Sequence, residues 1–142
     1  MKKIISILLF INVFAIGNAQ NIHKLLRAYE WKRGESIYLF ISRQDLYDNG
    51  NDEEERMCRR LKASGIILGF SGQTGRDHNM PAFQHYYALD GKNLSVLVEG
   101  EGWHNYTFSN ISKNGTIKFK YIKKNQDDFG ISMILEPIKK RK

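Results

Sequence analysis

The stretch that decides the fold is IKFKYI, residues 117–122. Apolar side chains at positions 117, 119 and 121 alternate there with a largely polar face that carries Lys118 and Lys120. Because successive side chains of a β-strand point to opposite faces of a sheet, this period of two predicts a strand with one face in a core and the other toward water.

The same alternation recurs along the chain, in residues 37–41, 83–89, 94–98 and 129–135. Turn-forming pairs separate several of these stretches: Asp90-Gly91, Glu101-Gly102 and Asn114-Gly115. Alternation broken by such pairs is typical of antiparallel strands joined by tight turns. We therefore predict a mainly β fold of about six to eight antiparallel strands, closed as a small barrel or packed as a sandwich.

Residues 52–63 are compatible with two structures. Acidic residues come first and basic residues last, and Glu55 precedes Arg59 by one helical turn, which favours a short helix. The same residues also allow a strand that ends in a hairpin turn at Ser64-Gly65. The local pattern favours the helix.

The first 19 residues have the features of a cleavable signal peptide. Lys2 and Lys3 precede a largely apolar run over residues 4–16, and small residues stand at positions 17 and 19. The run is shorter than the roughly 20 apolar residues that span a bilayer. We expect cleavage after Ala19 and export of a soluble or peripherally attached protein to the periplasm or the extracellular space.

The basic residues are concentrated at the two ends of the chain. The formal net charge is +7, from 22 basic and 15 acidic residues. Setting aside Lys2, Lys3 and the basic run 139–142 leaves 16 of the 22 basic residues against 15 acidic ones. We therefore predict one near-neutral β-rich domain over residues 20–138, which argues against a nucleic-acid groove. The basic tail 139–142 offers a peripheral contact with an anionic surface.

The order of motifs after the signal peptide resembles a group of small secreted β-rich proteins of unknown function from flavobacteria and their relatives. The signal ends in Asn-Ala-Gln, Trp31-Lys32 and Gly34 follow, and an extended apolar segment leads to Tyr47-Asp48. The likeness covers residues 29–69, although this chain has Tyr29-Glu30-Trp31 where the group has Gly-Thr-Trp. The resemblance implies a secreted β fold, and it implies a strand hairpin rather than a helix over residues 52–63.

Aromatic residues supply the candidate ligand-binding positions. Tyr86-Tyr87 and the stretch 103–106 place rings on both faces of their predicted strands. Rings that face outward can stack on sugars, whereas rings that face inward line an apolar cavity or fill a core. The candidates are Trp31, Tyr86, Tyr87, Trp103, His104 and Tyr106.

No pattern of catalytic or metal-ligating residues stands out. The four histidines lack the short paired spacing of metal ligands, so we expect no metal, no cofactor and no catalytic residue. A hydrolase would have to use Asp77 with His78 in the glycine-rich loop, or His85 with His104. The single cysteine, Cys58, is either buried or free to join two chains, and its neighbouring arginines would lower its pKa.

These observations favour an exported, non-enzymatic protein that binds an apolar ligand, a glycan or an envelope partner. One alternative is a protein inhibitor or immunity factor of the cell envelope that acts through its strand edges or the loop 72–81. A second alternative is a secreted metal- or histidine-dependent hydrolase. The sequence does not give the identity of the ligand or the oligomeric state.

Overall fold

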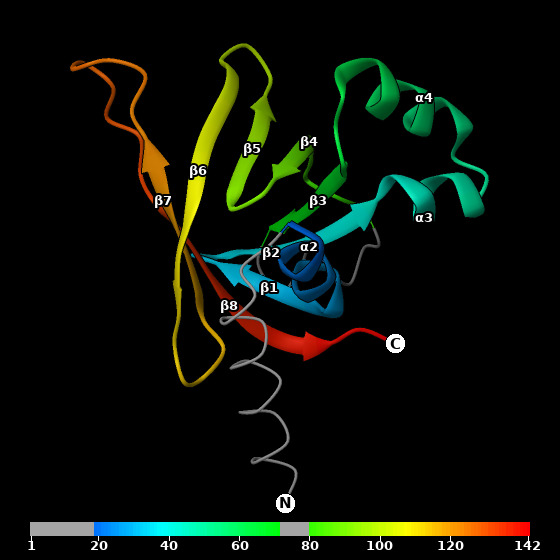
Figure 1. Cartoon of the computed structure of the whole chain (residues 1–142). Helices are drawn as coiled ribbons and strands as arrows, with labels where there is room; N and C mark the ends of the chain where they lie inside the picture. Colours follow the sequence, from blue (N-terminus) through cyan, green and yellow to red (C-terminus); the bar gives the residue numbers. More distant parts are fainter. Residues whose placement is uncertain (1–18, 72–79) are drawn as a thin grey trace, which may run out of the picture.

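The computed structural model describes residues 19–71 and 80–142, and these form a closed eight-stranded barrel (Figure 1). Each strand pairs antiparallel with its neighbours in the chain, and β8 closes the ring against β1. The strands are β1 (Tyr29–Arg33), β2 (Ser36–Ser42), β3 (Gly65–Ser71), β4 (Phe83–Asp90), β5 (Asn93–Val98), β6 (Gly102–Ile111), β7 (Ile117–Ile122) and β8 (Met133–Lys140). The prediction of a mainly β, antiparallel fold is confirmed, and the fold is a barrel rather than a sandwich. Residues 1–18 of the predicted signal peptide and the Asp77–His78 pair lie outside the described residues.

The period-two pattern sorts side chains between the barrel interior and its outer face. In β7 the side chains at 117, 119 and 121 are buried, and Lys118 and Lys120 are exposed, as the sequence predicted. In β2 the interior residues are Tyr38 and Phe40, so the aliphatic residues at 37, 39 and 41 form the outer face. Ile41 of this outer face packs against the apolar cluster that the helices between β2 and β3 cover.

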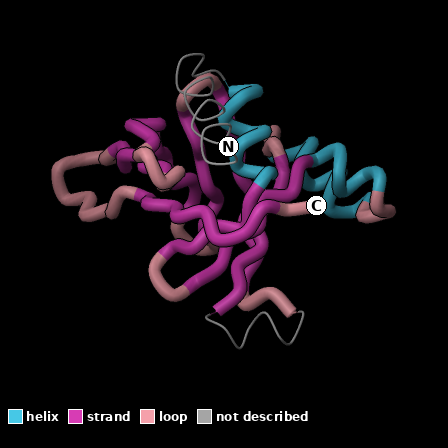
Figure 2. The backbone as a smooth tube through the Cα atoms, turned by 90° about the horizontal axis from the view of Figure 1, so that it is seen from below, coloured by secondary structure: helices cyan, strands magenta, loops and turns pink. Residues whose placement is uncertain are grey.

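Three helices lie on one side of the strands, as Figure 2 shows. They are α2 (Ala19–Ala28), which precedes β1, and α3 (Arg43–Asp48) and α4 (Asp52–Leu61), which connect β2 to β3. None of the helices in the described ranges is long and apolar enough to cross a bilayer.

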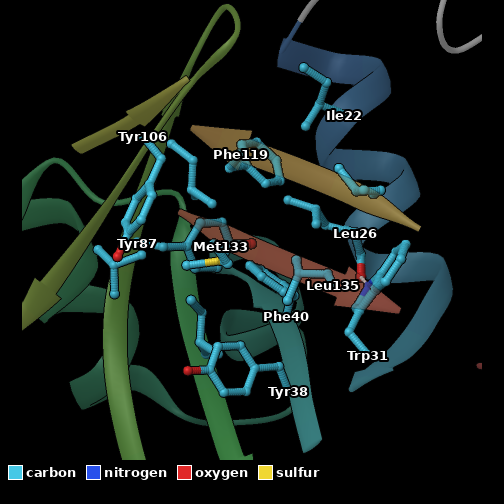
Figure 3. Packing of buried hydrophobic residues seen from close by; sticks show 14 of the residues in the cluster. Ile22, Leu26, Trp31, Tyr38, Phe40, Tyr87, Tyr106, Phe119, Met133 and Leu135 are labelled. Carbon is cyan, nitrogen blue, oxygen red and sulfur yellow. Dashed lines mark hydrogen bonds between the residues drawn. The ribbon is translucent and has the colours of Figure 1, made fainter. Parts of the chain in front are cut away.

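Helix α2 seals one end of the barrel, here called the helix end. Its side chains Ile22, Leu25 and Leu26 are buried in the same cluster as the interior residues of the strands. Figure 3 shows Ile22 and Leu26 pointing from α2 into this cluster. The indole Nε1 of Trp31 donates a hydrogen bond of 2.8 Å to the carbonyl oxygen of Leu26, which satisfies a carbonyl at the end of the helix. A second polar contact joins His23 Nε2 and the Tyr87 hydroxyl at 2.5 Å.

Helices α3 and α4 cover the outer face of β3. Leu46 of α3 and Cys58 of α4 are buried against Ala63 and Ile66. Helix α4 confirms the structure that the local charge pattern favoured, and the strand hairpin that the family resemblance implied for this segment is wrong. Acidic residues fill the first turn of α4 and arginines its last, and the helix ends at Lys62, which has a left-handed φ of 57°. Glu55 pairs with both Arg59 and Arg43 at about 3 Å.

The side chain of Cys58, on the buried face of α4, is fully buried and has a free thiol. Burial, followed by the negative charge of Glu54, raises the pKa of Cys58 to about 11. The expectation that neighbouring arginines lower this pKa is therefore wrong, because desolvation of the thiolate outweighs the cations. The thiol stays protonated near neutral pH.

Strand β8 differs from its predicted extent at both ends. It begins at Met133, so Phe129 and Ile131, which the alternation had included, lie before the strand and are 87% and 78% exposed. It continues to Lys140, so strand pairing extends two residues into the basic run 139–142. Arg141 then donates from Nη1 to the carbonyl oxygen of Phe40 at 2.6 Å, which holds this end of the chain against the barrel.

Replacing Leu26 by alanine tests the role of α2 as a structural part of the core. We expect Leu26→Ala to lower the free energy of unfolding by about 2–5 kcal/mol, because the change removes fully buried methyl groups and leaves a cavity. Chemical denaturation followed by circular dichroism measures the change. Lys24→Ala, at an exposed position of the same helix, is the control and is expected to shift stability by less than about 0.5 kcal/mol. A similar small effect of Leu26→Ala would show that α2 does not fold with the barrel.

Candidate functional site

The end of the barrel opposite α2 carries a second and more polar set of inward-facing side chains. Here called the loop end, it is where β1, β3, β5 and β7 finish and the next strand in each case begins. An interior of eight strands is just wide enough to be filled by side chains or to hold one small ligand. The helix-end half is filled by fully buried residues, including Trp31, Phe40 and Tyr87. The loop end is therefore the part of the interior where a ligand site is expected.

Arg33 places a positive charge inside the loop end. It lies two residues after the buried Trp31, so the strand period turns its side chain to the same face. Its Nη1 donates a hydrogen bond of 3.0 Å to the hydroxyl of Tyr38. Burial raises the pKa of the Tyr106 hydroxyl, and the adjacent Arg33 partly opposes that increase. Arg33 is thus half-buried between two tyrosines that face the interior.

Aromatic side chains form the wall beside Arg33. The rings of Phe83 and His85 stack with centroids 4.7 Å apart and an interplanar angle of 27°. Phe83 also meets Tyr38 edge to face at 5.4 Å. Gly69, the β3 partner of Phe83, makes room for this ring, since a Cβ atom there would lie 1.9 Å from it.

His85 is held in its neutral form by this environment. Burial lowers its pKa, and the positive charge of Arg33 lowers it further, while Glu99 acts in the opposite direction. The imidazole is therefore uncharged near pH 7, where it offers one donor and one acceptor to a ligand. His104 also contributes to the lowered pKa of His85. The two histidines of the hydrolase hypothesis make their ring contacts with different residues, His85 with Phe83 and His104 with Tyr121.

A surface hollow of about 450 Å³ lies at the loop end and includes His104 in its lining. His104 and Tyr121 line its barrel side, and residues 124, 125, 127 and 128 line its outer side together with Glu101. His104 Nε2 lies 2.8 Å from Glu101 Oε2 and meets the Tyr121 ring edge to face at 5.9 Å. Tyr121 in turn meets Tyr106 at 5.4 Å, so ring contacts run from the hollow to the surroundings of Arg33.

Tyr121 also fixes the segment that forms the outer wall of the hollow. Its hydroxyl donates a hydrogen bond of 2.8 Å to Asp128 Oδ2, and Asp128 accepts further bonds from the backbone of Lys124 and Gly130. The hydrogen bond to Asp128, followed by burial, raises the pKa of Tyr121 to about 12. The ring packs directly on Gly130, where a Cβ atom would lie 1.8 Å from it. Tyr121 thereby anchors the segment between β7 and β8 through Asp128 and Gly130.

The six aromatic candidates from the sequence fall into three groups. His104 and Tyr106 come together at the loop end. Trp31 and Tyr87 are fully buried in the helix-end core. Tyr86 and Trp103 face outward and pack against the helix-covered cluster, and the Tyr86 hydroxyl donates to Glu54 Oε2 at 2.7 Å.

Sequence reasoning missed Arg33, Tyr38 and Phe83. A signal for Arg33 was present, since a charged residue two positions after an inward tryptophan must face the same way in a strand. Tyr38 was hidden because the aliphatic residues 37, 39 and 41 drew attention to the other face of β2. Phe83 belonged to a predicted strand face, but the sequence did not indicate that its ring stacks on His85.

A second hollow, of about 240 Å³, lies between α3 and α4 and is lined by Arg43, Gln44, Tyr47, Glu55 and Arg59. Its two arginines are both paired with Glu55, so the charges there already neutralise one another in part. In the described ranges, 19–71 and 80–142, no three His, Cys, Asp or Glu side chains form a group suited to a metal ion.

Comparison of the chain with protein-family models, with curated proteins and with solved structures finds no match. The resemblance over residues 29–69 therefore stays a prediction. The chemistry of the loop end itself, a half-buried cation among tyrosine hydroxyls, a neutral imidazole and ring faces, suits a small ligand that combines an acidic group with an apolar body.

The pKa of His85 tests whether Arg33 lies beside it. We expect Arg33→Gln to raise the His85 pKa toward the ordinary value of about 6.5, because a neighbouring positive charge no longer opposes protonation. Titration of the imidazole signals by NMR measures the change. Lys32→Gln removes a charge from the exposed face of the same strand and is expected to leave the His85 pKa nearly unchanged.

The lowered pKa of His85 also predicts the direction in which the free energy of unfolding changes with pH. The unfolded chain binds protons more readily than the folded one, so stability decreases as the pH falls below about 6.5. Arg33→Gln should make the loss of stability at low pH smaller, because the His85 pKa then lies closer to its value in the unfolded chain. An unchanged His85 pKa in this variant would contradict the geometry described for the loop end.

Proposed function

We propose that the chain is an exported, non-enzymatic binding protein whose loop end holds a small ligand with an acidic group and an apolar or aromatic body. The observation that carries this proposal is the inward orientation of Arg33, whose guanidinium contacts Tyr38 inside the barrel. A cation placed away from water is costly unless a partner offsets the loss of hydration. A carboxylate or similar anion is the partner that an arginine binds best, because the planar guanidinium donates two parallel hydrogen bonds.

The surroundings of Arg33 favour a ligand that is otherwise apolar. Phe83 and His85 offer stacked ring faces, and the interior beyond them is filled with apolar side chains. Such a site resembles the general form of small-molecule pockets, which are mostly apolar with a few polar groups that fix orientation. The fold adds support by analogy, since eight-stranded antiparallel barrels commonly enclose one small ligand.

Two features weigh against the other partners that the sequence left open. The outward rings Tyr86 and Trp103, which would serve as a platform for a glycan, are engaged by the cluster under α3 and α4. Among the described strands none has an unpaired edge, so this chain offers no strand edge through which it could inhibit a partner. An inhibitor acting through loop 72–81 stays an alternative.

Export rests on the sequence, and the packing of α2 is compatible with it. Ile22, Leu25 and Leu26, the described side chains of α2 that are buried in the core, all follow the predicted cleavage position at Ala19. A processed chain would therefore keep Ile22, Leu25 and Leu26, the buried side chains of α2 among the residues whose burial the structure describes. We propose a periplasmic or extracellular location on this basis.

A hydrolase is the second candidate, favoured by one contact. Glu101 Oε2 lies 2.8 Å from His104 Nε2, which is the arrangement of a carboxylate that orients a histidine base. The one cysteine is not available as its nucleophile, because Cys58 lies on the buried face of α4, outside the barrel interior, and is protonated near neutral pH. Release of product from the ligand during incubation, lost in His104→Gln, would favour the hydrolase over the binding protein.

A matched pair of ligands tests the binding proposal. Naphthoate and its uncharged analogue naphthamide share one ring system and differ in charge, so isothermal titration of both isolates the contribution of the acidic group. We expect the processed protein to prefer naphthoate, and Arg33→Gln to weaken naphthoate binding by about 10- to 100-fold, the range for loss of a charge-assisted hydrogen bond.

Naphthamide binding should change little in Arg33→Gln, and Lys32→Gln should leave both affinities intact because this side chain is exposed on the outer face. Equal affinities of the wild type and Arg33→Gln for naphthoate would contradict the proposal. Equal affinities of the wild type for naphthoate and naphthamide would contradict it too.

A further inference from the structure

The outer side of β7 and the segment before β8 expose large apolar side chains. Phe129 and Ile131 are 87% and 78% exposed, and Ile122 and Ile134 are more than one-third exposed. Isolated exposed apolar residues are common, whereas apolar side chains grouped in one patch with polar residues around it mark interaction surfaces. Figure 1 shows the segment that follows β7, in orange, extending away from the body of the barrel.

Four lysines are exposed on β7 and in the segment that follows it. Lys118 and Lys120 are exposed on the outer face of β7, and Lys123 and Lys124 follow directly in the next segment. Lys118 lies opposite Ile134 in the β7–β8 register, so basic and apolar side chains are neighbours across the strands. The apolar–basic surface is defined here as Lys118, Lys120, Ile122, Lys123, Lys124, Phe129, Ile131 and Ile134.

Acidic residues near this surface are largely engaged elsewhere. The Asp128 carboxylate accepts hydrogen bonds from the Tyr121 hydroxyl and from two backbone amides, which keeps it against the barrel. Glu136, which faces outward on β8, lies opposite Lys32 of β1. Asp127 is exposed, which leaves the four lysines of the surface in excess.

We infer that the apolar–basic surface docks on an anionic lipid bilayer. Phe129 and Ile131 would enter the boundary between headgroups and acyl chains, while the lysines contact the anionic headgroups. A lysine can extend its ammonium group to the headgroups while its methylene stem lies along the apolar region. A protein partner fits less well, because lysine is depleted in the core of protein–protein interfaces.

Docking in this way would bring the candidate ligand site to the membrane. Segment 123–132 supplies both the apolar side chains of the surface and, through residues 124, 125, 127 and 128, one wall of the hollow at the loop end. If the proposed function holds, an amphipathic ligand would pass between bilayer and barrel over a short path. The docking itself does not depend on that function, since it can be measured without any ligand.

The surface is distinct from the basic run at the end of the chain. Strand β8 runs from the loop end to the helix end, so Lys139 and Lys140 lie at the far end of the strand from Met133. Arg141 is half-buried, and burial lowers its pKa while its side chain bonds to the backbone of β2. The two basic regions can therefore be tested separately.

Co-sedimentation of the full processed chain with vesicles tests the inference. Vesicles of phosphatidylcholine alone are compared with vesicles that also contain phosphatidylglycerol, at low and at high salt. We expect binding to the anionic vesicles only, weakened by salt because the lysine contribution is screened. The double variant Phe129→Ser, Ile131→Ser should lower the partition constant by about tenfold or more.

The charge variant Lys120→Gln, Lys124→Gln should lower the partition constant by about fivefold for each lysine removed. Tyr47→Ser, at an exposed position of α3, is the control for loss of an apolar side chain. The pair Lys139→Gln, Lys140→Gln is the control for loss of charge. All variants alter exposed positions, and circular dichroism checks that each retains the fold.

Three outcomes would overturn the inference. The first is equal binding, or no binding, to neutral and anionic vesicles. The second is binding that is lost in the Lys139, Lys140 variant and kept in the Phe129, Ile131 variant, which would assign it to the basic run. The third is a concentration-dependent dimer in analytical ultracentrifugation that the Phe129, Ile131 variant abolishes, which would make the surface a contact between copies of this chain.

Discussion

The pairing of β8 with β1 is the constraint on which the rest of the structure depends. These strands are the first and the last of the barrel in sequence, and their antiparallel pairing, with Tyr29 opposite Lys140, turns an eight-stranded meander into a ring. Closure removes the two edges that an open sheet would expose to other chains. Closure also encloses an interior, so that alternate side chains along each strand point into the barrel or out toward its surroundings. The contact of Arg141 with the backbone of β2 strengthens the same closure.

The interior divides into two halves with different chemistry. At the helix end, α2 completes an apolar core, and the Trp31 indole donates a hydrogen bond to the Leu26 carbonyl in the last turn of that helix. At the loop end, Arg33, the histidines of β4 and β6 and three tyrosines replace the aliphatic residues. The helix-end half of the barrel therefore stabilises the fold, whereas the polar groups of the loop-end half reduce its stability. Proteins that place a binding site on a rigid scaffold commonly show this division.

Local patterns predicted the strands but not the way in which side chains of distant strands meet. Alternation in β7 and acidic-to-basic order in α4 are local properties, and both predicted the observed element. The apolar outer face of β2 depends on helices further along the chain, so the sequence of that strand alone was misleading. Of the residues that form the candidate site at the loop end, only His104 and Tyr106 were among the ligand-binding positions proposed from the sequence. The contact of Arg33 with Tyr38 depends on the register of β1 and β2, which alternation does not determine.

The buried thiol of α4 has a consequence for how this part of the molecule can be observed. Cys58 is shielded by a two-helix insertion and not by the barrel itself, and its protonated state makes it unreactive while the insertion is in place. Alkylating reagents reach such a group only when the surrounding helices detach from the sheet. The rate of thiol modification therefore reports how often the insertion opens, independently of whether the barrel unfolds. In an oxidising compartment the same shielding keeps this unpaired cysteine from cross-linking neighbouring molecules.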